Sequence, residues 1–187
     1  MLKGVKTIFF DFDGCIANTI EAIVSLYNED FVAYKKFQPI KWWDINTWDF
    51  KECMCASREY INTYFNQPRF FNRLEFMPNA KEAIEEIKGF YDIKIITHGF
   101  KPNLRLKKQW IENNLPGIEM IGVNLKKYKD KSHIDMSDGF FLDDSSGNIR
   151  TSNAKYKAVF GDIYSWNEDW AGKRLCNWED VRRELLG

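Results

Sequence analysis

The first apolar segment of the chain shows almost no alternation of hydrophobic and polar positions. Residues 7–14 read Thr-Ile-Phe-Phe-Asp-Phe-Asp-Gly, an apolar run that ends in two carboxylates two positions apart. Such a run is typical of a parallel strand that is covered on both faces. Because strand side chains alternate, Asp11 and Asp13 should project to the same side of the strand end. Gly14 then permits a sharp turn.

Helix and strand patterns alternate from Pro78 to the end of the chain. Helical spacing of apolar residues predicts helices around Ala80–Ile87, after Pro102 and from Asn177, which can form an N-cap with Asp180. Apolar runs predict further strands at 92–97, 118–123, 139–142 and 158–160, the last of which should close the sheet. Strands separated by helices predict an α/β fold, a Rossmann-like parallel sheet with helices on both faces.

Residues 17–77 do not continue this alternation. Apolar spacing predicts one helix from Asn18 or Thr19 and another near Ser57, and the segment holds fourteen of the thirty aromatic residues. The excess indicates a small helical unit with an aromatic core. We therefore expect residues 1–16 and 78–187 to form an α/β core domain, and residues 17–77 to form a helical, aromatic-rich insertion.

Charge and cysteine content exclude several classes of protein. The 27 basic and 27 acidic residues balance, which argues against a broad basic surface for nucleic acid polymers or anionic membranes. No apolar stretch approaches membrane-spanning length, and residues 1–6 lead into a strand rather than a cleavable signal, so we expect a soluble cytoplasmic protein. Cys53-x-Cys55 could contribute to a zinc site, but the two histidines are isolated, and reduced thiols are the simpler interpretation.

Polar side chains follow the predicted strands at their carboxyl ends, where ligands bind in open α/β sheets. These residues are Asp11, Asp13, Thr97, Asp143 and Asp144. Lys131 belongs to the basic run 126–131, which leads into the strand before Asp143. Carboxylate oxygens suit a hard ion such as Mg²⁺, and the hydroxyl and ammonium groups suit phosphate oxygens.

In this order, Asp-x-Asp-Gly, Thr after a strand, Lys, then Asp-Asp after another strand, the set resembles the haloacid dehalogenase-like (HAD) phosphatase superfamily over nearly the whole chain. Response-regulator receiver domains share an acidic pocket, a Thr and a Lys. They lack a sixty-residue insertion and an Asp-Asp pair after the lysine. Residues 130–144, the tail from Val159 to Val181 and the helix with Lys107 and Trp110 are similar to 5'(3')-deoxyribonucleotidases.

The resemblance implies a phosphomonoesterase that works through an aspartyl-phosphate intermediate. Asp11 would be the nucleophile, and Asp13 the general acid and base. Mg²⁺ would be held by the Asp11 carboxylate, the Asp13 main-chain carbonyl and Asp143, while Asp144 would support them or cap a helix.

The resemblance also implies that Thr97, His98 and Lys131 bind phosphate. Thr97 could instead cap the next helix, and His98, where the nucleotidases usually have Ser, could be an ordinary loop residue. The lysine assignment stays open within its basic run, whose other members are Lys126, Lys127 and Lys129.

The insertion would be a cap over the site, with Phe12, Trp42 and Trp43 as candidates to stack on a nucleobase. Aromatic residues in a small cap can equally form its own core.

The implied partner is a small phosphate ester, a pyrimidine deoxyribonucleoside monophosphate by resemblance. Base preference, 5' versus 3' position and oligomeric state stay open, and a homodimer is compatible with the sequence. The alternatives are another small phosphate ester, or a non-catalytic binding protein on the same fold.

Overall fold

The computed structural model describes residues 2–187. The strands are β1 (Thr7–Phe10), β2 (Asp92–Gly99), β3 (Glu119–Asn124), β4 (Gly139–Asp143), β5 (Tyr156–Phe160) and β6 (Arg174–Leu175). The helices are α1 (Thr19–Phe31), α2 (Arg58–Tyr64), α3 (Pro68–Phe71), α4 (Ala80–Ile87), α5 (Lys101–Asn114), α6 (Ser146–Thr151) and α7 (Trp178–Leu186), with a 3-10 helix, η1 (Trp42–Asp44).

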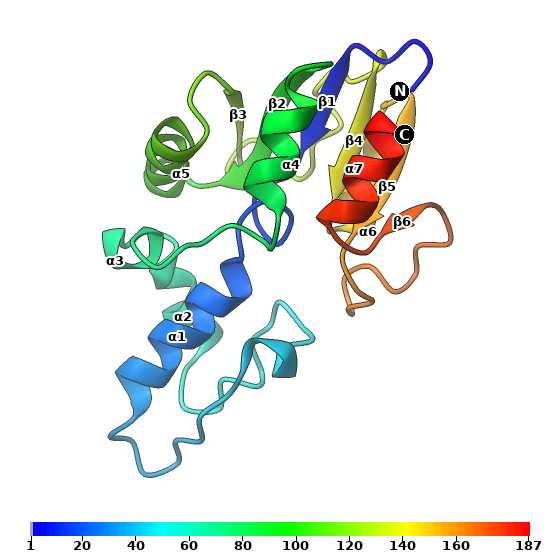
Figure 1. Ribbon diagram of the computed structural model, residues 1–187. Helices are drawn as coiled ribbons and strands as arrows, with labels where there is room; N and C mark the ends of the chain where they lie inside the picture. The colour runs from blue at the N-terminus through cyan, green and yellow to red at the C-terminus, as the bar shows by residue number, and fades with distance from the viewer. Residues whose placement is uncertain (1) are drawn as a thin grey trace.

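The six strands form one parallel sheet in the order β3-β2-β1-β4-β5-β6 (Figure 1). β1 is central, and its Phe10 lies opposite Ile95 of β2 and Leu142 of β4. The chain builds outward from β1 to β3, then returns to the other side of β1 and continues outward. Ligands bind at such a reversal of strand order, beyond the carboxyl ends of the strands. The predicted α/β fold is therefore confirmed, and its topology points to the end of β1.

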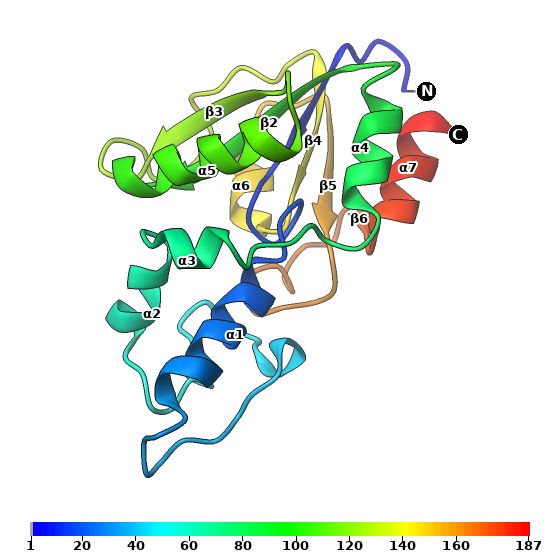
Figure 2. The ribbon, with the colours of Figure 1, turned by 60° about the vertical axis from the view of Figure 1, so that its left-hand side comes forward.

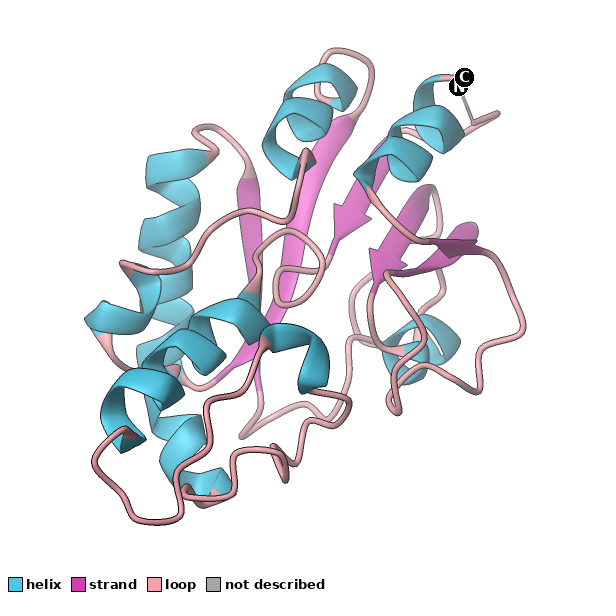
Figure 3. Cartoon of the chain, turned by 60° about the horizontal axis from the view of Figure 1, so that its bottom comes forward, coloured by secondary structure: helices cyan, strands magenta, loops and turns pink. Residues whose placement is uncertain are grey.

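Both faces of the sheet are covered, as the unbroken apolar run of β1 predicts. Phe10 and Ile95 pack in one cluster with residues of α4, α5 and α7, whereas Phe9 and Phe141 pack in a second cluster with Ile149 of α6. Figure 3 shows the strands enclosed between these helices. Alternate residues of β1 thus serve opposite faces, and all four are buried.

Two elements at the far side of the sheet differ from the sequence-based expectation. The strand at 158–160 was expected to be the last, and this was wrong, because β6 pairs with β5 beyond it. β6 has only two residues, too few to show an apolar run. The helix α6 has no apolar pattern to predict it, since its sequence Ser-Gly-Asn-Ile-Arg-Thr contains a single apolar residue. Asp144, considered as a helix cap, directly precedes the N-cap, which is Ser145.

Polar side chains mark the starts of the predicted helices. Asn18 and Ser57 accept hydrogen bonds from the backbone at the first turns of α1 and α2. The expected N-cap of α7 is confirmed, because Asn177 Oδ1 accepts from the Asp180 amide at 2.9 Å. These caps satisfy backbone donors that have no partner inside the helix.

Helices α1, α2 and α3 lie beyond the carboxyl ends of the strands (Figures 1 and 2). The chain leaves and re-enters the sheet region through two neighbouring segments. The Asn18 amide donates to the Glu75 carbonyl at 2.9 Å, and the Met77 amide donates to the Ile16 carbonyl at 2.7 Å. We refer to residues 17–77 as the insertion. Among the described residues, every helix is too short or too polar to span a lipid bilayer.

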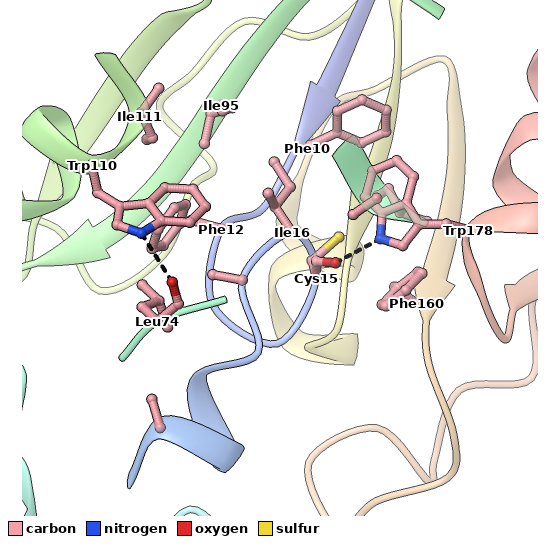
Figure 4. Packing of buried hydrophobic residues seen from close by; sticks show 14 of the residues in the cluster. Phe10, Phe12, Cys15, Ile16, Leu74, Ile95, Trp110, Ile111, Phe160 and Trp178 are labelled. Atoms are coloured by element: carbon pink, nitrogen blue, oxygen red, sulfur yellow. Dashed lines mark hydrogen bonds between the residues drawn. The ribbon is translucent and has the colours of Figure 1, made fainter. Parts of the chain in front are cut away.

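Two tryptophans from the helices α5 and α7 flank the loop after β1 (Figure 4). Trp178 Nε1 donates to the Cys15 carbonyl at 2.9 Å. Trp110 packs edge-on against Phe12, with ring centroids 5.3 Å apart, and its Nε1 donates to the Leu74 carbonyl at 3.2 Å. Packing of two large rings against one short loop fixes the backbone that carries the paired aspartates.

Candidate functional site

Three buried charged side chains meet at the carboxyl end of β1. Asp11 directly follows β1, Asp143 ends the adjacent β4, and Lys131 lies in the loop before β4. Lys131 Nζ donates to Asp143 Oδ2 at 2.6 Å and also to Asp11 Oδ1. Although burial opposes its charge, these two carboxylates raise the pKa of Lys131 above its ordinary value. The exposed lysines of the same run are Lys126, Lys127 and Lys129.

Asp13 belongs to a second charged group beside the first. Its Oδ2 accepts from Lys107 Nζ, and its Oδ1 accepts from Thr19 Oγ1 at 3.1 Å. The same ammonium group donates to Thr97 Oγ1 at 2.8 Å and to the His98 carbonyl at 2.8 Å. Lys107, on α5, is only 2% exposed. A single buried cation therefore fixes both the Asp13 carboxylate and the end of β2.

Asp144 and Gly14 approach each other closely. Gly14 has a φ of +69°, and a Cβ at this position would lie 2.8 Å from Asp144 Oδ2. Both the backbone conformation and the contact require glycine. Asp144 Oδ2 accepts from Trp166 Nε1 at 2.8 Å, which orients the carboxylate.

The two adjacent aspartates have different surroundings. Asp143 uses both carboxylate oxygens inside the protein: Oδ2 accepts from Lys131, and Oδ1 accepts from the Ser145 amide at 2.8 Å and from Asn148 Nδ2 at 3.1 Å. Asp144 accepts one side-chain hydrogen bond, from Trp166. The second aspartate of the pair thus keeps more of its lone pairs free for a ligand.

This donor set fits a hard divalent cation. Oxygen atoms of Asp11, Asp143 and Asp144 lie within 4.8 Å of one another, and all three residues are buried. Three carboxylates face one direct ammonium partner, Lys131. Burial raises the pKa of Asp11 to about 7 against the opposing charge of Lys131. Burial and the charges of Asp143 and Asp11 raise the pKa of Asp144 well above its ordinary value. A bound Mg²⁺ would relieve this surplus of negative charge.

A cavity of about 480 Å³, the first cavity, opens in front of Asp11 and Asp13. Its other walls come from the insertion, from α5 and from the segments at the ends of β2, β3 and β4. The insertion supplies Trp48, Arg58, Asn62, Phe65 and Asn66. Its volume is within the range of small-molecule sites. The first cavity therefore presents the paired aspartates to a ligand that also touches the insertion.

His98 and Thr97 have separate positions at the end of β2. His98 lines the first cavity, and its Nε2 is buried with no hydrogen-bond partner among the described residues. Burial, with a smaller effect from the charge of Lys131, lowers the pKa of His98 to about 4, so the ring is neutral near pH 7. Thr97 is fully buried, and the N-cap of α5 is Phe100, so Thr97 does not cap that helix.

The three aromatic residues considered for base stacking lie outside the lining of the first cavity. Phe12 is fully buried against Trp110, so its ring belongs to the core. Trp42 lines a different cavity, and Trp43 is 59% exposed on η1. Another tryptophan of the insertion, Trp48, lines the first cavity instead.

Sequence reasoning missed Lys107 and the polar residues of α2 as members of the site. Lys107 carried a detectable signal, because it falls on the same helical face as Trp110 and Ile111, where a lysine is out of place unless it has a partner. Arg58 and Asn62 carried none, since they form a polar helix face that looks the same whether it meets solvent or a ligand.

Solved structures place this fold among HAD-type hydrolases. A haloacid dehalogenase-like family hydrolase from Streptococcus pneumoniae has a TM-score of 0.67 at 12% identity, with 98% of this chain and 99% of that chain covered. A Bacillus subtilis protein described as a HAD-hydrolase bound to magnesium has a TM-score of 0.65 at 11% identity, with coverage of 99% and 100%. At these identities the likeness defines the fold.

Sequence comparison defines the family. A family model described as "5' nucleotidase, deoxy (Pyrimidine), cytosolic type C protein" matches residues 5–186. A relative from Clostridium acetobutylicum, named 5'(3')-deoxyribonucleotidase, is 24% identical over 176 residues, covering 94% of this chain and 92% of its own. The chain therefore belongs to this nucleotidase family. It is a HAD-type phosphatase, a hydrolase of phosphoric monoesters.

Proposed function

We propose that this protein removes the phosphate group from a nucleoside monophosphate, with Asp11 as nucleophile and Mg²⁺ as cofactor. The observation that carries the proposal is the joint exposure of Asp11 and Asp13 to one cavity, each carboxylate bound by its own buried lysine. A protein that only binds phosphate has no need for two carboxylates pointing at an anion. Such a pair fits a nucleophile and a proton carrier.

Asp11 would attack phosphorus while the ester oxygen leaves, which forms an aspartyl-phosphate and releases the nucleoside. Asp13 would give its proton to the leaving oxygen, then take one from the water that cleaves the intermediate. Lys107 and Thr19 would orient Asp13 for both steps, since each bonds one of its carboxylate oxygens. Lys131, Thr97 and His98 would position the phosphoryl oxygens.

Mg²⁺ would be held by the Asp11 and Asp144 carboxylates and the Asp13 main-chain carbonyl. This reverses the expectation from sequence, in which Asp143 was the ligand and Asp144 the support. The reason is that Asp143 is already bonded through both oxygens by Lys131, Ser145 and Asn148. When bound, the ion supplies charge neutralisation for the phosphoryl group.

The insertion would act as the cap that selects the substrate and excludes water. The shape and charge of the first cavity suit a nucleotide: Arg58 and Lys107 favour an anion, and Trp48 and Phe65 offer aromatic surface for a base. The name of the Clostridium relative supports a deoxyribonucleotide, and we infer a pyrimidine base from the family description. We further propose that the enzyme works in the cytoplasm.

The test is phosphate release from dUMP and dTMP, with Mg²⁺ and with a chelator. Asp11→Asn should reduce kcat about 10³-fold or more, because the nucleophile is lost. Asp138→Asn, which changes an exposed aspartate, is the matched control and should retain full activity. Equal activity of Asp11→Asn and the native protein would refute the mechanism. A panel of non-nucleotide phosphate esters, including an aryl phosphate, separates the proposed substrate from the alternatives.

A further inference from the structure

A second cavity, of about 340 Å³, lies beside the first and shares Asp144 with it. The insertion contributes Ile20 of α1 and Trp42 of η1 to its lining. The core contributes Tyr164, Trp166 and Trp178, with Cys176 nearby in the lining. Apart from Asp144, none of these residues lines the first cavity. The second cavity is therefore a separate space between the insertion and the core.

The two cavities differ in charge. The cations Arg58 and Lys107 line the first cavity. The described residues that line the second cavity include no lysine, arginine or histidine, but they do include the carboxylates of Glu21 and Asp144. A phosphate dianion would meet the Glu21 carboxylate there, with no lysine or arginine among the described lining residues to compensate it. The second cavity therefore suits a molecule without negative charge.

The walls of the second cavity are flat and aromatic. Tyr164 and Trp166 stack with ring centroids 4.4 Å apart and an angle of 3° between their planes. Hydrogen bonds from Trp166 Nε1 to Asp144 and from Trp178 Nε1 to the Cys15 carbonyl fix two of the indole rings. Trp42 is 38% exposed and adds an indole from the insertion. Preformed aromatic walls of this kind favour a planar ring.

Polar groups at the second cavity could complement a heterocycle. Asn177 Oδ1 is occupied by the Asp180 amide, which leaves its Nδ2 able to donate, and Glu21 contributes a carboxylate acceptor. A pyrimidine edge carries both acceptors and donors. A hydrocarbon ring would leave these groups without partners.

We propose that the second cavity binds an uncharged nucleoside, the dephosphorylated counterpart of the substrate. That the ligand is a neutral planar ring follows from the lining of the cavity. That it is a nucleoside rests on the proposed function. Because Ile20 and Trp42 belong to the insertion while Tyr164 and Trp178 belong to the core, the bound nucleoside bridges the two.

Cys176 provides a local readout of occupancy. It is exposed and lines the second cavity, whereas the half-buried Cys55 lies outside it and serves as internal reference. Alkylation by iodoacetamide is followed by peptide mass spectrometry, with inorganic phosphate and Mg²⁺ present to fill the first cavity. Deoxyuridine at about 10 mM, enough to reveal millimolar affinity, should slow alkylation of Cys176 about fivefold or more and leave Cys55 unchanged. In Asp11→Asn, which should not convert dUMP to deoxyuridine, dUMP should protect Cys176 at least about tenfold less effectively than deoxyuridine.

Variants test where the protecting molecule binds. Trp42→Ala should weaken protection by deoxyuridine about tenfold, because an aromatic wall is lost. Ile20→Phe, which fills the second cavity from α1, should weaken it as well. Phe65→Ala, a loss of one aromatic ring from the first cavity, should not change it. The proposal fails if deoxyuridine does not protect Cys176 in the native protein, or protects it only when inorganic phosphate is left out. Equal protection in the native protein and in Trp42→Ala would also overturn it.

Failure of this proposal and failure of the proposed function give different results. The alkylation assay reports binding without turnover, so it is repeated in Asp11→Asn. Protection without any nucleotide hydrolysis would support the second site and refute the proposed function. Hydrolysis of dUMP without protection of Cys176 would do the opposite.

Discussion

The two cavities that share Asp144 have similar aromatic walls but differ in the charge of the side chains that line them. Each takes one wall from the insertion and one from the core, and each includes tryptophan. Among the described residues, the cations Arg58 and Lys107 line the first cavity, and no lysine or arginine lines the second. On the proposed function, the placement of a few cations, rather than the aromatic content of a cavity, decides which one receives the phosphate ester.

The cations of the first cavity come from segments far apart in sequence. Lys107 belongs to α5 of the core, while Arg58 belongs to α2 of the insertion. The second cavity instead takes its core wall from the loop around Tyr164 and the start of α7. Sheet topology thus brings positive charge to the end of β1 and leaves the neighbouring space acidic.

Asp144 lines both cavities, so its replacement should have the largest effect on activity and on Mg²⁺ binding. Asp144→Asn should reduce kcat about 10²- to 10³-fold and abolish thermal stabilisation by Mg²⁺, because the proposed metal ligand is lost. A Mg²⁺ titration followed by thermal unfolding measures this directly.

Asp143→Asn is the matched control for Asp144→Asn. It should lower the free energy of unfolding by about 3–5 kcal/mol, since Lys131 loses a buried partner, yet the folded variant should still be stabilised by Mg²⁺. The opposite pattern, with Mg²⁺ stabilisation lost in Asp143→Asn and kept in Asp144→Asn, would restore Asp143 as the ligand.

Lys107→Met should reduce the difference between the two cavities, because it removes one cation from the first. The Asp13 carboxylate and the Thr97 hydroxyl would lose their shared donor, so kcat should fall about 10²-fold, while KM changes less. Lys108→Met, at the adjacent exposed lysine, controls for helix propensity and should behave as the native protein. Native kcat in Lys107→Met would show that Asp13 needs no such positioning.

Trp48→Ala tests whether aromatic surface in the first cavity contributes to substrate binding. KM for dUMP should rise about tenfold with little change in kcat, because stacking is lost in ground and transition states alike. The comparison variant is Trp42→Ala, which should leave KM unchanged. If Trp42→Ala raises KM instead, the base lies in the second cavity and the proposed assignment of the two spaces fails.

Asp30→Asn should lower the stability of the protein with a small effect that is the same for both cavities. Asp30 on α1 accepts two hydrogen bonds from Arg69 on α3, so the variant should lose about 2 kcal/mol of unfolding free energy and little activity. Hydrogen bonds from Arg69 hold the pKa of Asp30 below its ordinary value. The stabilisation is therefore present above about pH 3.8 and lost as the pH falls further. Urea unfolding at pH 7 and pH 3 measures both effects.

Much of the fold was predictable because its signals are local. The apolar run of β1, the alternation after Pro78 and the N-cap at Asn177 each depend on a few consecutive residues. β6 and α6 were not predictable, since their pairing and packing depend on neighbours distant in sequence rather than on their own composition.

The candidate site divides in the same way. The carboxylates could be placed from the sequence, because the spacing of Asp11 and Asp13 and their position at a strand end do not depend on the surrounding residues. The choice of Lys131 over its exposed neighbours, and of Trp48 over Trp42 as a wall of the first cavity, depends on which side chains the folded loops turn inward. No periodic pattern in the sequence contains that information.

The central claim is that Asp11 becomes phosphorylated during turnover. Native protein mixed with dUMP and Mg²⁺, quenched in acid within milliseconds and digested, should yield the peptide containing Asp11 with one added phosphoryl group. The same peptide from Asp11→Asn should carry none. A phosphoryl group on another residue, or full hydrolysis with no trapped adduct at any quench time, would contradict this account of the enzyme.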